Sequence, residues 1–463
     1  MGDVDFLIIG AGPAGMAAAA QAARLGMSTA ILDEQPAPGG QIYRGVEVAG
    51  PVRGRILGKD FLNGVQLAQG VRHAGIRYIP GATVWKAEAG GSVAYSVEGA
   101  ARTIRGRRLL LATGALERPV PLPGWTLPGV MTVGAAQILL KQSGVVPRRA
   151  VIAGSGPLLY LVAAQMVRAG RPPLALVETP ERRDLLRALR HLGGALRGWR
   201  YMAKGVGWFA ELARAGVPRY RSATELRIEG TDKAEALSFV AGGRNRCIAC
   251  ETVLLHEGVV PNTQASRAMN LPHHWDAGQR CFVPDHDVWG QTAEPRVYVA
   301  GDGAGIGGAQ AAEQAGCLAA LHAAAALGHI GNDERDRRGA RHLRRLAREM
   351  AARPFLEAAY PPGMQTRAPA DDTIVCRCEE VTAGDIRRHA ALGCRGPNQA
   401  KAFGRAGMGP CQGRYCGLTV TGLLAAQTGQ TPAETGYYRI RPPLKPITVA
   451  ELAALEPDPG ENT

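Results

Sequence analysis

Four cysteines near the end of the 463-residue chain fall into two close pairs, Cys376 with Cys378 and Cys411 with Cys416. Soft thiolate ligands select iron–sulfur clusters or zinc, and four thiolates in two pairs suit either metal centre. The segment before and within the second pair is rich in glycine, which would let backbone N–H groups turn toward the sulfides of a cluster. The spacing therefore predicts a redox cluster and leaves zinc open as the alternative.

A second set of residues with chemical meaning lies at the N-terminus. Residues 6–15 read FLIIGAGPAG, an apolar strand followed by Gly10, Gly12 and Gly15 at G-x-G-x-x-G spacing and then an Ala-rich helix. The first glycine makes the tight turn, the second lets a pyrophosphate approach the backbone, and the third lets the helix pack on the strand. The next apolar stretch ends in Asp33-Glu34, where a carboxylate takes the ribose hydroxyls. The pattern predicts a dinucleotide site.

Three further segments favour a flavin over a nicotinamide in this site. Pro38-Gly39-Gly40-Gln41 is a turn that could bring backbone near an isoalloxazine ring, and residues 109–114, LLLATG, are an apolar strand that ends in small residues. Residues 297–302, VYVAGD, form another strand that ends in Gly301-Asp302, before a helix that starts near Ala309. Asp302 can hold a ribityl hydroxyl, while the N-terminus of that helix faces the flavin phosphate or pyrimidine.

Together these features resemble the glutathione- and thioredoxin-reductase-like flavoproteins, which contain two dinucleotide-binding domains. The resemblance implies a split FAD-binding domain at residues 1–120 and 270–345, with an inserted nucleotide domain at 121–269. The expected fold class is α/β, with two Rossmann-like domains followed by a small four-cysteine domain. The residues that we expect to contact FAD are Gly10, Gly12, Pro13, Ala14, Gly15, Asp33, Glu34, Gly39, Gly40, Gln41, Val84, Ala112, Thr113, Gly114, Gly301, Asp302 and Ala309.

The inserted domain opens with a second glycine motif. Residues 150–156 read AVIAGSG, which places Gly154 and Gly156 after an apolar strand, and Glu178 ends the next strand. Leu159 stands where Gly15 stands in the first motif, and a bulky side chain there loosens helix–strand packing near the phosphates. The pattern predicts a nucleotide-binding fold with Gly154, Gly156 and Glu178 as site residues. It leaves open whether the fold binds NAD(P), holds ATP or NAD tightly, or serves as a scaffold.

A Pro-rich segment separates these domains from the cysteines. We place a linker at 346–372, a small domain at 373–430 and a C-terminal tail at 431–463. The small domain resembles the [2Fe-2S] domain of bacterioferritin-associated ferredoxins, whose first pair is also C-x-C. The resemblance implies that Cys376, Cys378, Cys411 and Cys416 ligate a [2Fe-2S] cluster. The second pair is C-x4-C where that family has C-x-x-C, which puts a role in iron release from bacterioferritin in doubt.

The chain has a formal net charge of +14, and its basic residues gather in two stretches. In residues 182–204 and 335–353, Leu and Ala recur at helical spacing between arginines, which predicts solvated or subunit-docking helix faces. An anionic membrane surface or an acidic partner is the alternative reading of this charge. No zinc finger, RNA-recognition signature or aromatic-interleaved basic run points to nucleic acid.

No stretch of the sequence approaches the length of apolar chain that spans a bilayer, and the first strand begins too early to leave room for a signal peptide. We therefore expect a cytoplasmic protein, or one that is held at the inner face of a membrane through other subunits. The nine cysteines all lie at or after Cys247. Their odd number argues against a disulfide framework and for metal or redox use.

Several segments carry a more specific resemblance. Nearly end to end, the chain resembles the α subunits of opine oxidases and of D-hydroxyproline or L-proline dehydrogenases, and the B subunit of hydrogen cyanide synthase. The segments that carry it are ERP at 117–119, PGWTLPGV at 123–130, GDGAGI at 301–306, CRCEEVT at 376–382 and GRAGMGPCQGRYC at 404–416.

This resemblance implies a division of labour. A β subunit similar to D-amino-acid or sarcosine oxidases would oxidise the substrate, and this chain would pass electrons through flavin and [2Fe-2S] centres to a quinone or another acceptor. The resemblance also allows a small γ subunit and FMN at the subunit interface. No residue set stands out as catalytic, which suits a relay based on cofactors. A stand-alone NAD(P)H-dependent FAD reductase with its own cluster is the alternative, and an iron–sulfur binding or sensing protein is a third.

Overall fold

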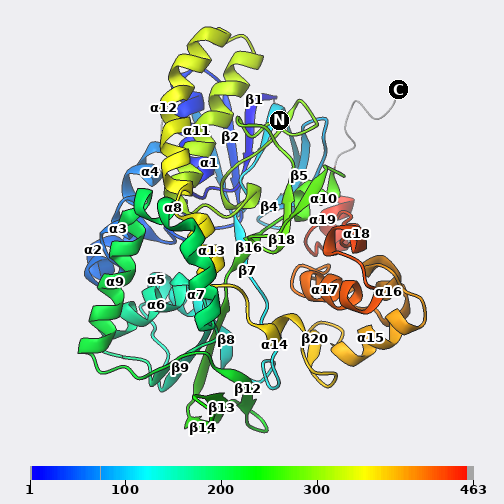
Figure 1. The fold of residues 1–463 in the computed structure, drawn as a ribbon. Helices are drawn as coiled ribbons and strands as arrows, with labels where there is room; N and C mark the ends of the chain where they lie inside the picture. The colour runs from blue at the N-terminus through cyan, green and yellow to red at the C-terminus, as the bar shows by residue number, and fades with distance from the viewer. Residues whose placement is uncertain (1–2, 73–74, 456–463) are drawn as a thin grey trace.

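The computed structural model describes residues 3–72 and 75–455, so the first two residues of the predicted FAD domain and the last eight of the predicted tail lie outside the described residues. Two sheet-based units and one small helical unit make up the fold (Figure 1). In Figure 1 the first unit lies at the top, the second at the lower left in green, and the small unit at the right in orange and red. Among the described helices, none combines the length and apolar character needed to cross a membrane.

The first unit is built on a seven-stranded sheet whose neighbouring strands run β3-β2-β1-β6-β5-β4, with β19 also pairing with β6. β1, β2, β3, β6 and β19 are parallel to one another, and β4, β5 and β6 form an antiparallel meander. The strands are β1 (Val4–Ile9), β2 (Thr29–Asp33), β3 (Ile76–Pro80), β4 (Thr83–Ala87), β5 (Ser92–Val97), β6 (Ala100–Leu111) and β19 (Val297–Val299). The helices are α1 (Pro13–Arg24), α2 (Val46–Leu57), α3 (Lys59–Leu62), α4 (Gly64–Gly70), α11 (Ala309–Ala326) and α12 (Asn332–Met350).

The close approach of α1 and α11 gives the first unit its core. A Cβ atom on Gly316 would lie 2.1 Å from the carbonyl oxygen of Ala14, and one on Gly301 would lie 2.8 Å from the Cβ of Ala14. Only glycine and alanine allow two helices to pack at this distance. The apolar residues of β1 supply the other side of this core, because Phe6 and Ile8 are fully buried beneath the helices.

The second unit is a five-stranded parallel sheet in the order β11-β10-β9-β15-β8, with helices packed on it and an antiparallel sheet of β12, β13 and β14 beside it. The strands are β8 (Val130–Thr132), β9 (Ala150–Ser155), β10 (Ala175–Glu178), β11 (Arg219–Tyr220), β12 (Thr224–Glu229), β13 (Ala236–Ala241), β14 (Arg244–Ala249) and β15 (Thr252–Glu257). The helices are α5 (Val133–Ser143), α6 (Pro157–Arg168), α7 (Arg182–Ala188), the 3-10 turn η1 (Leu189–His191), α8 (Leu192–Arg197) and α9 (Trp199–Arg214).

Short antiparallel pairs connect the two sheet-based units. The chain leaves the first sheet through β7 and returns through β16, which pairs with β7, and the hairpin of β17 and β18 follows. Their bounds are β7 (Ala115–Glu117), β16 (Val259–Pro261), β17 (His273–Asp276) and β18 (Cys281–Pro284), with α10 (Gln264–Ala268) before the hairpin and the 3-10 turn η2 (Gly301–Ala304) after β19. These strands place Thr113, after β6, next to Asn262, after β16. Oγ1 of Thr113 donates to the carbonyl oxygen of Asn262 at 2.9 Å.

The small C-terminal unit is mostly helical and shares a hydrophobic core with the far face of the first sheet. Val375, Cys376 and Leu424 belong to the same buried cluster as Leu7 and Leu109 of that sheet. The elements are β20 (Ile374–Cys376), β21 (Val381–Thr382), α15 (Ala383–Ala391), α16 (Pro397–Gly404), α17 (Gly417–Thr428), α18 (Pro432–Thr435) and α19 (Val449–Ala453). The unit therefore packs against the body of the molecule as a continuation of its core.

The structure confirms the α/β class, and it confirms that the two basic stretches are helical, since they form α7–α9 and α12. The segment that we interpreted as a linker is partly helical, with α13 (Arg353–Ala359) and α14 (Met364–Arg367). The segment that we placed in the tail packs into the small unit, because Tyr438 and Ile440 are buried in its core. Aromatic residues this far along the chain find their place only through long-range packing, which a linear pattern does not display.

Candidate functional site

The glycine turn after β1 has no room for larger residues at two of its three positions. Gly10 has φ +105°, and a Cβ atom there would lie 2.4 Å from the carbonyl oxygen of Ala112. A Cβ on Gly15 would lie 1.9 Å from the carbonyl oxygen of Gly10. A Cβ on Gly12, in contrast, would have only the Cα of Gly40 within 4 Å, at 3.9 Å. Gly10 and Gly15 thus serve the fold, and Gly12 faces open space beside the start of α1.

Helix α1 begins directly at this turn, with Gly12 as its N-cap and Pro13 in its first turn. No side chain caps its first N–H groups, and the helix is 12 residues long. A helix N-terminus with free N–H groups next to a glycine-lined space is a ready site for a phosphate. Pro13 fits this place because the missing N–H of a proline would have no partner in the first turn. The cradle therefore fits a dinucleotide pyrophosphate.

The two acidic residues at the end of β2 have different surroundings. Asp33 is buried and accepts hydrogen bonds from the N–H of Ala11 at 2.5 Å and of Gln35 at 2.7 Å. Burial raises the pKa of Asp33, and these two N–H donors act against that rise. Glu34 is exposed and forms an ion pair with Lys445 of the C-terminal segment. Asp33 thus orders the glycine turn, and Glu34 binds Lys445 of the C-terminal segment.

The predicted flavin-facing turns gather at the same edge of the sheet. The N–H of Gly39 donates to the carbonyl oxygen of Ala11 at 2.8 Å, which places the Gly39-Gly40-Gln41 turn against the first glycine turn. Ala112, Thr113 and Gly114 follow β6 and lie beside η2, where a Cβ on Gly303 would be 3.1 Å from Oγ1 of Thr113. The carboxyl ends of parallel strands are where α/β sheets bind their ligands.

Asp302 holds the turn that leads into α11. Its Oδ1 accepts hydrogen bonds from the N–H groups of Gly307 at 2.9 Å and of Gly308 at 2.8 Å, just before Ala309 begins the helix. Val84 lies on β4, near Ala82, whose N–H donates to the carbonyl oxygen of Asp33 at 2.9 Å. The residues expected to contact FAD therefore lie around one edge of one sheet.

Lys141 is a residue of this region that the sequence did not single out, since its surroundings read as surface or packing. It is 3% exposed, on α5 of the second unit, and its Nζ donates to the carbonyl oxygen of Gln41 at 3.0 Å and to Oε1 of Gln137 at 2.8 Å. Burial lowers the pKa of Lys141 to about 7. The spacing of Gln137 and Lys141, four residues apart in an apolar helix, was the available signal.

The same buried polar chain continues across the boundary of the two units. Nε2 of Gln137 donates to Oε1 of Gln165 at 2.9 Å, and Nε2 of Gln165 donates to the carbonyl oxygen of Leu57 at 3.2 Å. Buried polar groups that satisfy one another specify one arrangement of the elements that carry them. This chain of bonds fixes α5 and α6 against the Gln41 turn and the end of α2.

The second glycine motif has different side chains around it. Gly154 has φ +129°, and its Cβ would lie 1.8 Å from the carbonyl oxygen of His256; the ring of His256 would lie 3.0 Å from a Cβ on Gly156. Nδ1 of His256 is 2.7 Å from Oε1 of Glu117, so the ring is fixed there. The glycines of this motif allow β9 and β15 to approach, and an imidazole ring lies over the turn.

Glu178, the expected ribose ligand of the second motif, already has a strong partner. Its two oxygens accept from Nε and Nη2 of Arg219 at 2.6 and 3.1 Å, and its side chain is buried. Arg219 lies over the ring of Phe209 with its guanidinium carbon 4.4 Å from the ring centroid. A bidentate ion pair of this kind is among the stronger polar contacts in proteins. A nucleotide ribose would have to compete with it.

The four cysteines expected to bind a cluster are brought together by the small unit. Sγ of Cys378 lies 3.7 Å from Sγ of Cys411, and the thiol of Cys416 donates to Cys376. The hydrogen bond from Cys416 lowers the pKa of Cys376 to about 6, helped by the N–H of Gly407, which lies 3.4 Å from its sulfur. In residues 3–72 and 75–455, no three His, Cys, Asp or Glu side chains are grouped so that they could hold a single metal ion.

Glycines let the backbone surround these thiols closely. A Cβ on Gly409 would lie 2.2 Å from the Cβ of Cys378, and Cβ atoms on Gly407 and Gly413 would lie 2.5 and 2.3 Å from the ring of Tyr438. The hydroxyl of Tyr438 lies 3.9 Å from Sγ of Cys416. Two thiol pairs, with the N–H of Gly407 beside one sulfur and the hydroxyl of Tyr438 near another, fit the donor set of a cluster in which each of two irons takes two thiolates.

The remaining cysteines are separate from this group. Cys394 is buried in the small unit, Cys281 is buried on β18, and Cys317 is partly buried on α11. Cys247 is exposed on β14, and Cys250 is buried just after it. Burial raises the pKa of the Cys281 and Cys250 thiols, so neither is a reactive thiolate near neutral pH.

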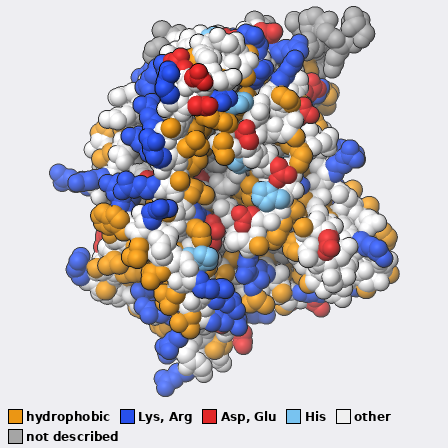
Figure 2. All heavy atoms as spheres, turned by 45° about the horizontal axis from the view of Figure 1, so that its top comes forward, with side chains coloured by type: hydrophobic (Ala, Val, Ile, Leu, Met, Phe, Trp, Pro, Cys, Tyr) orange, Lys and Arg blue, Asp and Glu red, His pale blue; other side chains and the backbone are white. Residues whose placement is uncertain are grey.

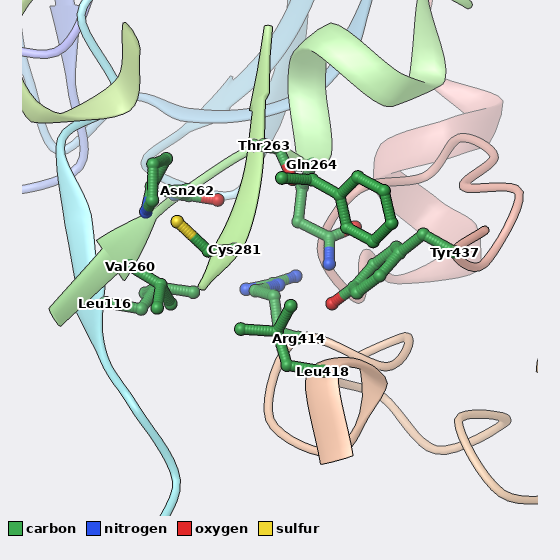
Figure 3. A pocket seen from close by; sticks show the side chains of 11 residues that line it. Leu116, Val260, Asn262, Thr263, Gln264, Cys281, Arg414, Leu418 and Tyr437 are labelled. Carbon is green, nitrogen blue, oxygen red and sulfur yellow. The ribbon is translucent and has the colours of Figure 1, made fainter. Parts of the chain in front are cut away.

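A small cavity lies where the cysteine unit meets the body of the molecule (Figure 3). Its volume is about 20 Å³, enough for one water molecule. Figure 3 shows the guanidinium of Arg414 directed into the space between Cys281 and Tyr437. Nε of Arg414, Oδ1 of Asn262 and Oε1 of Gln264 have no hydrogen-bond partner among the described residues. The contact between the two parts is thus polar at its centre.

Aromatic rings pack next to this cavity, where the small unit contacts the body of the molecule. The guanidinium carbon of Arg267 lies 4.3 Å from the ring centroid of Tyr437 and 4.7 Å from that of Phe282, and the two rings meet edge to face. The hydroxyl of Tyr437 donates to the carbonyl oxygen of Gly413 at 3.1 Å. A cation between two aromatic faces adds specificity to a packed interface.

Comparisons with known proteins agree with this architecture. The model of the pyridine nucleotide-disulphide oxidoreductase family matches residues 4–316, and the model of the sarcosine oxidase A3 domain matches residues 371–456. The A subunit of opine oxidase from Agrobacterium tumefaciens (strain Ach5) is 45% identical over 97% of this chain and 92% of that protein. The HcnB subunit of hydrogen cyanide synthase from Pseudomonas aeruginosa is 33% identical over 95% of this chain and 96% of that protein.

The fold also matches a solved structure. The crystal structure of L-proline dehydrogenase from P. horikoshii covers 97% of this chain, and the match covers 79% of that chain, with a TM-score of 0.72 and 19% identity, which shows a shared fold. Two Rossmann-like α/β units with a family model across both define an oxidoreductase. The chain belongs to the pyridine nucleotide-disulphide oxidoreductase family, and the resemblance to the A subunits of opine oxidases is confirmed. A family domain of this kind implies FAD.

The glycine turn offers a matched pair of substitutions. Gly12→Ala adds a methyl group to the open side of the turn, so we expect an unchanged free energy of unfolding of the apoprotein and FAD binding weakened by about tenfold or more. Gly15→Ala forces its methyl group against the carbonyl oxygen of Gly10 and should destabilise the apoprotein by about 1–3 kcal/mol. Urea denaturation and titration of FAD fluorescence measure the two effects. Wild-type FAD affinity in Gly12→Ala would show that the flavin binds elsewhere.

The buried lysine predicts a pH dependence. Because the folded state holds Lys141 at a pKa of about 7, below its ordinary value of 10.5, the unfolded chain binds more protons between these values. The contribution of Lys141 to the free energy of unfolding therefore rises with pH from about 7 to about 10.5 and is constant below this window. Lys141→Met should lose that rise, measured by urea denaturation at the two ends of the window. The exposed Lys59, replaced in the same way, is the control, and equal slopes for wild type and Lys141→Met would contradict the assignment.

Proposed function

We propose that this chain is the electron-transfer subunit of a multi-subunit dehydrogenase or oxidase that oxidises the C–N bond of an amino acid or an opine. FAD would lie at the first glycine turn and a [2Fe-2S] cluster between Cys376, Cys378, Cys411 and Cys416. Bound there, these groups supply the exchange between two-electron and one-electron redox chemistry. The 45% identity to the A subunit of an opine oxidase supports this class of enzyme.

One observation carries the proposal: packed residues lead from the expected flavin turn to the four thiols. Thr113 is bonded to Asn262, and Asn262 lines the small cavity together with Arg414. Arg414 lies in the loop between Cys411 and Cys416, and its Nη2 donates to the carbonyl oxygen of Leu444 at 2.5 Å. A short, water-poor path between two redox sites is what a relay within one chain requires.

The second glycine motif favours the role of a subunit over that of a self-sufficient reductase. An NAD(P)H-dependent reductase needs a dinucleotide in the second unit. There the ring of His256 lies over Gly156, and the carboxylate of Glu178 is already bound by Arg219. The segment after α13 also reaches this edge, because the N–H of Gly363 donates to Oε2 of Glu257 at 2.8 Å. We therefore propose that Gly154, Gly156 and Glu178 belong to a scaffold, with ATP or NAD held tightly as the alternative.

The substrate site would lie on a partner chain. A β subunit similar to D-amino-acid or sarcosine oxidases would oxidise the substrate, with FMN at the subunit interface and a small γ subunit as further components, and a quinone as the acceptor. The names of the relatives span opines, proline, sarcosine and cyanide formation, so the substrate class stays at amino acids and opines, including proline, hydroxyproline, octopine, nopaline and glycine.

The test is a set of visible spectra of the purified chain, alone and together with the proposed β subunit. We expect NADH to leave the flavin oxidised in both samples. An amino-acid or opine substrate should bleach the flavin band of this chain only when the partner is present. Bleaching of the isolated chain by NADH would replace this proposal with the self-sufficient reductase.

The cysteine assignment has its own test. Cys378→Ser should lose the cluster, measured as iron, acid-labile sulfide and the electron paramagnetic resonance signal after reduction, whereas Cys394→Ser should keep all three. Cys394 is the matched control because it is buried in the same unit and takes no part in the thiol group. Wild-type protein with zinc and no labile sulfide would contradict the cluster and leave a structural metal in its place.

A further inference from the structure

Helices α7–α9 present an unusual surface. Between residues 185 and 206, seven large apolar side chains are exposed by 47–67%, although apolar residues on amphipathic helices usually face the core. We call this surface the basic apolar belt. Its apolar members are Leu185, Leu186, Leu189, Leu192, Leu196, Trp199 and Val206.

The inner faces of these helices are already packed, so the exposed side chains of the belt do not contribute to the core. Ala188 and Ala195 are buried toward the body of the molecule, and α7 and α8 contact α13 on that side. Leu212 is the buried residue of α9. Contiguous exposed apolar side chains that the fold does not use mark a surface for a partner.

The belt is also strongly basic. Residues 182–204 contain seven Lys and Arg against one acidic residue, Asp184, which is buried and bonded in its own helix turn. Arg182, Arg197 and Arg200 are exposed and form no ion pair with any residue in the described part of the chain. Their charge is therefore available to an anionic partner.

The basic surface extends beyond the belt onto α12. Arg344 and Arg348 of α12 are exposed, and a groove of about 490 Å³ runs between α8 and the end of α12, lined by Gly194, Arg197 and Met350 among others. Figure 2 shows Lys and Arg side chains along one side of the molecule with apolar side chains interspersed among them and below them. The belt and the end of α12 thus meet at this groove.

We propose that the basic apolar belt binds directly to an anionic phospholipid surface. Leucine and tryptophan side chains would enter the boundary between headgroups and acyl chains, and the arginines between them would contact lipid phosphates. Interleaving of Arg with Leu along consecutive helices fits a surface that offers phosphate and hydrocarbon everywhere. The inference stands on the surface itself and does not depend on the redox assignment.

Lipid vesicles test the proposal on the full-length chain. It should sediment with vesicles of phosphatidylglycerol and phosphatidylcholine in equal parts, and not with vesicles of phosphatidylcholine alone, and the binding should fall as salt is added. The double variant Arg197→Gln, Arg200→Gln should lower the partition coefficient by about 30-fold. The double variant Leu186→Glu, Leu196→Glu should lower it by about tenfold or more.

Leu392→Glu is the matched control, since Leu392 is 70% exposed on the small unit, outside the belt, and the variant should bind as wild type does. Equal thermal stability of all variants shows that each folds. Failure of wild type to bind the acidic vesicles at low salt would overturn the proposal. If instead Leu186→Glu, Leu196→Glu abolishes assembly with the oxidase-like subunit and leaves vesicle binding unchanged, the belt is a subunit interface and the lipid proposal falls.

Discussion

The contact between α1 and α11 is the constraint on which the arrangement around the first glycine turn depends. Gly316 and Gly301 meet Ala14 at distances that admit no larger residue, and this brings a late segment of the chain onto the helix that follows the first glycine turn. β19 can then pair with β6, and Asp302 reaches the same edge of the sheet as Gly12. The whole second unit is inserted between these two halves, so its position also rests on that contact.

The two glycine motifs show how one supersecondary pattern acquires two uses. In the first, Gly15 allows the helix to pack on the strand, and the space beside Gly12 remains open. In the second, Leu159 takes the place of the third glycine and is itself buried, while His256 covers Gly156. The fold survives both versions because strand pairing and helix packing do not require a ligand. The two motifs differ in which polar groups remain free to bind a ligand.

Local patterns carried most of what could be predicted. The strand-turn-helix around Gly10 and the acid at Asp33 involve neighbours within one supersecondary unit, and the two cysteine pairs are each close in sequence. Arg219 and Tyr438 were beyond reach, because each depends on a partner distant in the chain: Glu178 and the thiol group. For Lys141 the local spacing to Gln137 was a signal, but its contact with Gln41 was not predictable from sequence. A lone lysine, an arginine in a short strand and a late tyrosine look ordinary until packing brings them to their partners.

The shared core between the cysteine unit and the first sheet has a kinetic consequence. Carrier domains on flexible tethers must diffuse to one site, dock, leave and find another in every cycle, and their rates vary with tether length and solvent viscosity. Here Val375 and Leu424 are buried in the same cluster as Leu7, and Lys445 holds the last segment to Glu34. The separation between the first glycine turn and the four thiols is therefore a constant of the fold, so electron transfer between redox groups bound there would need no domain diffusion.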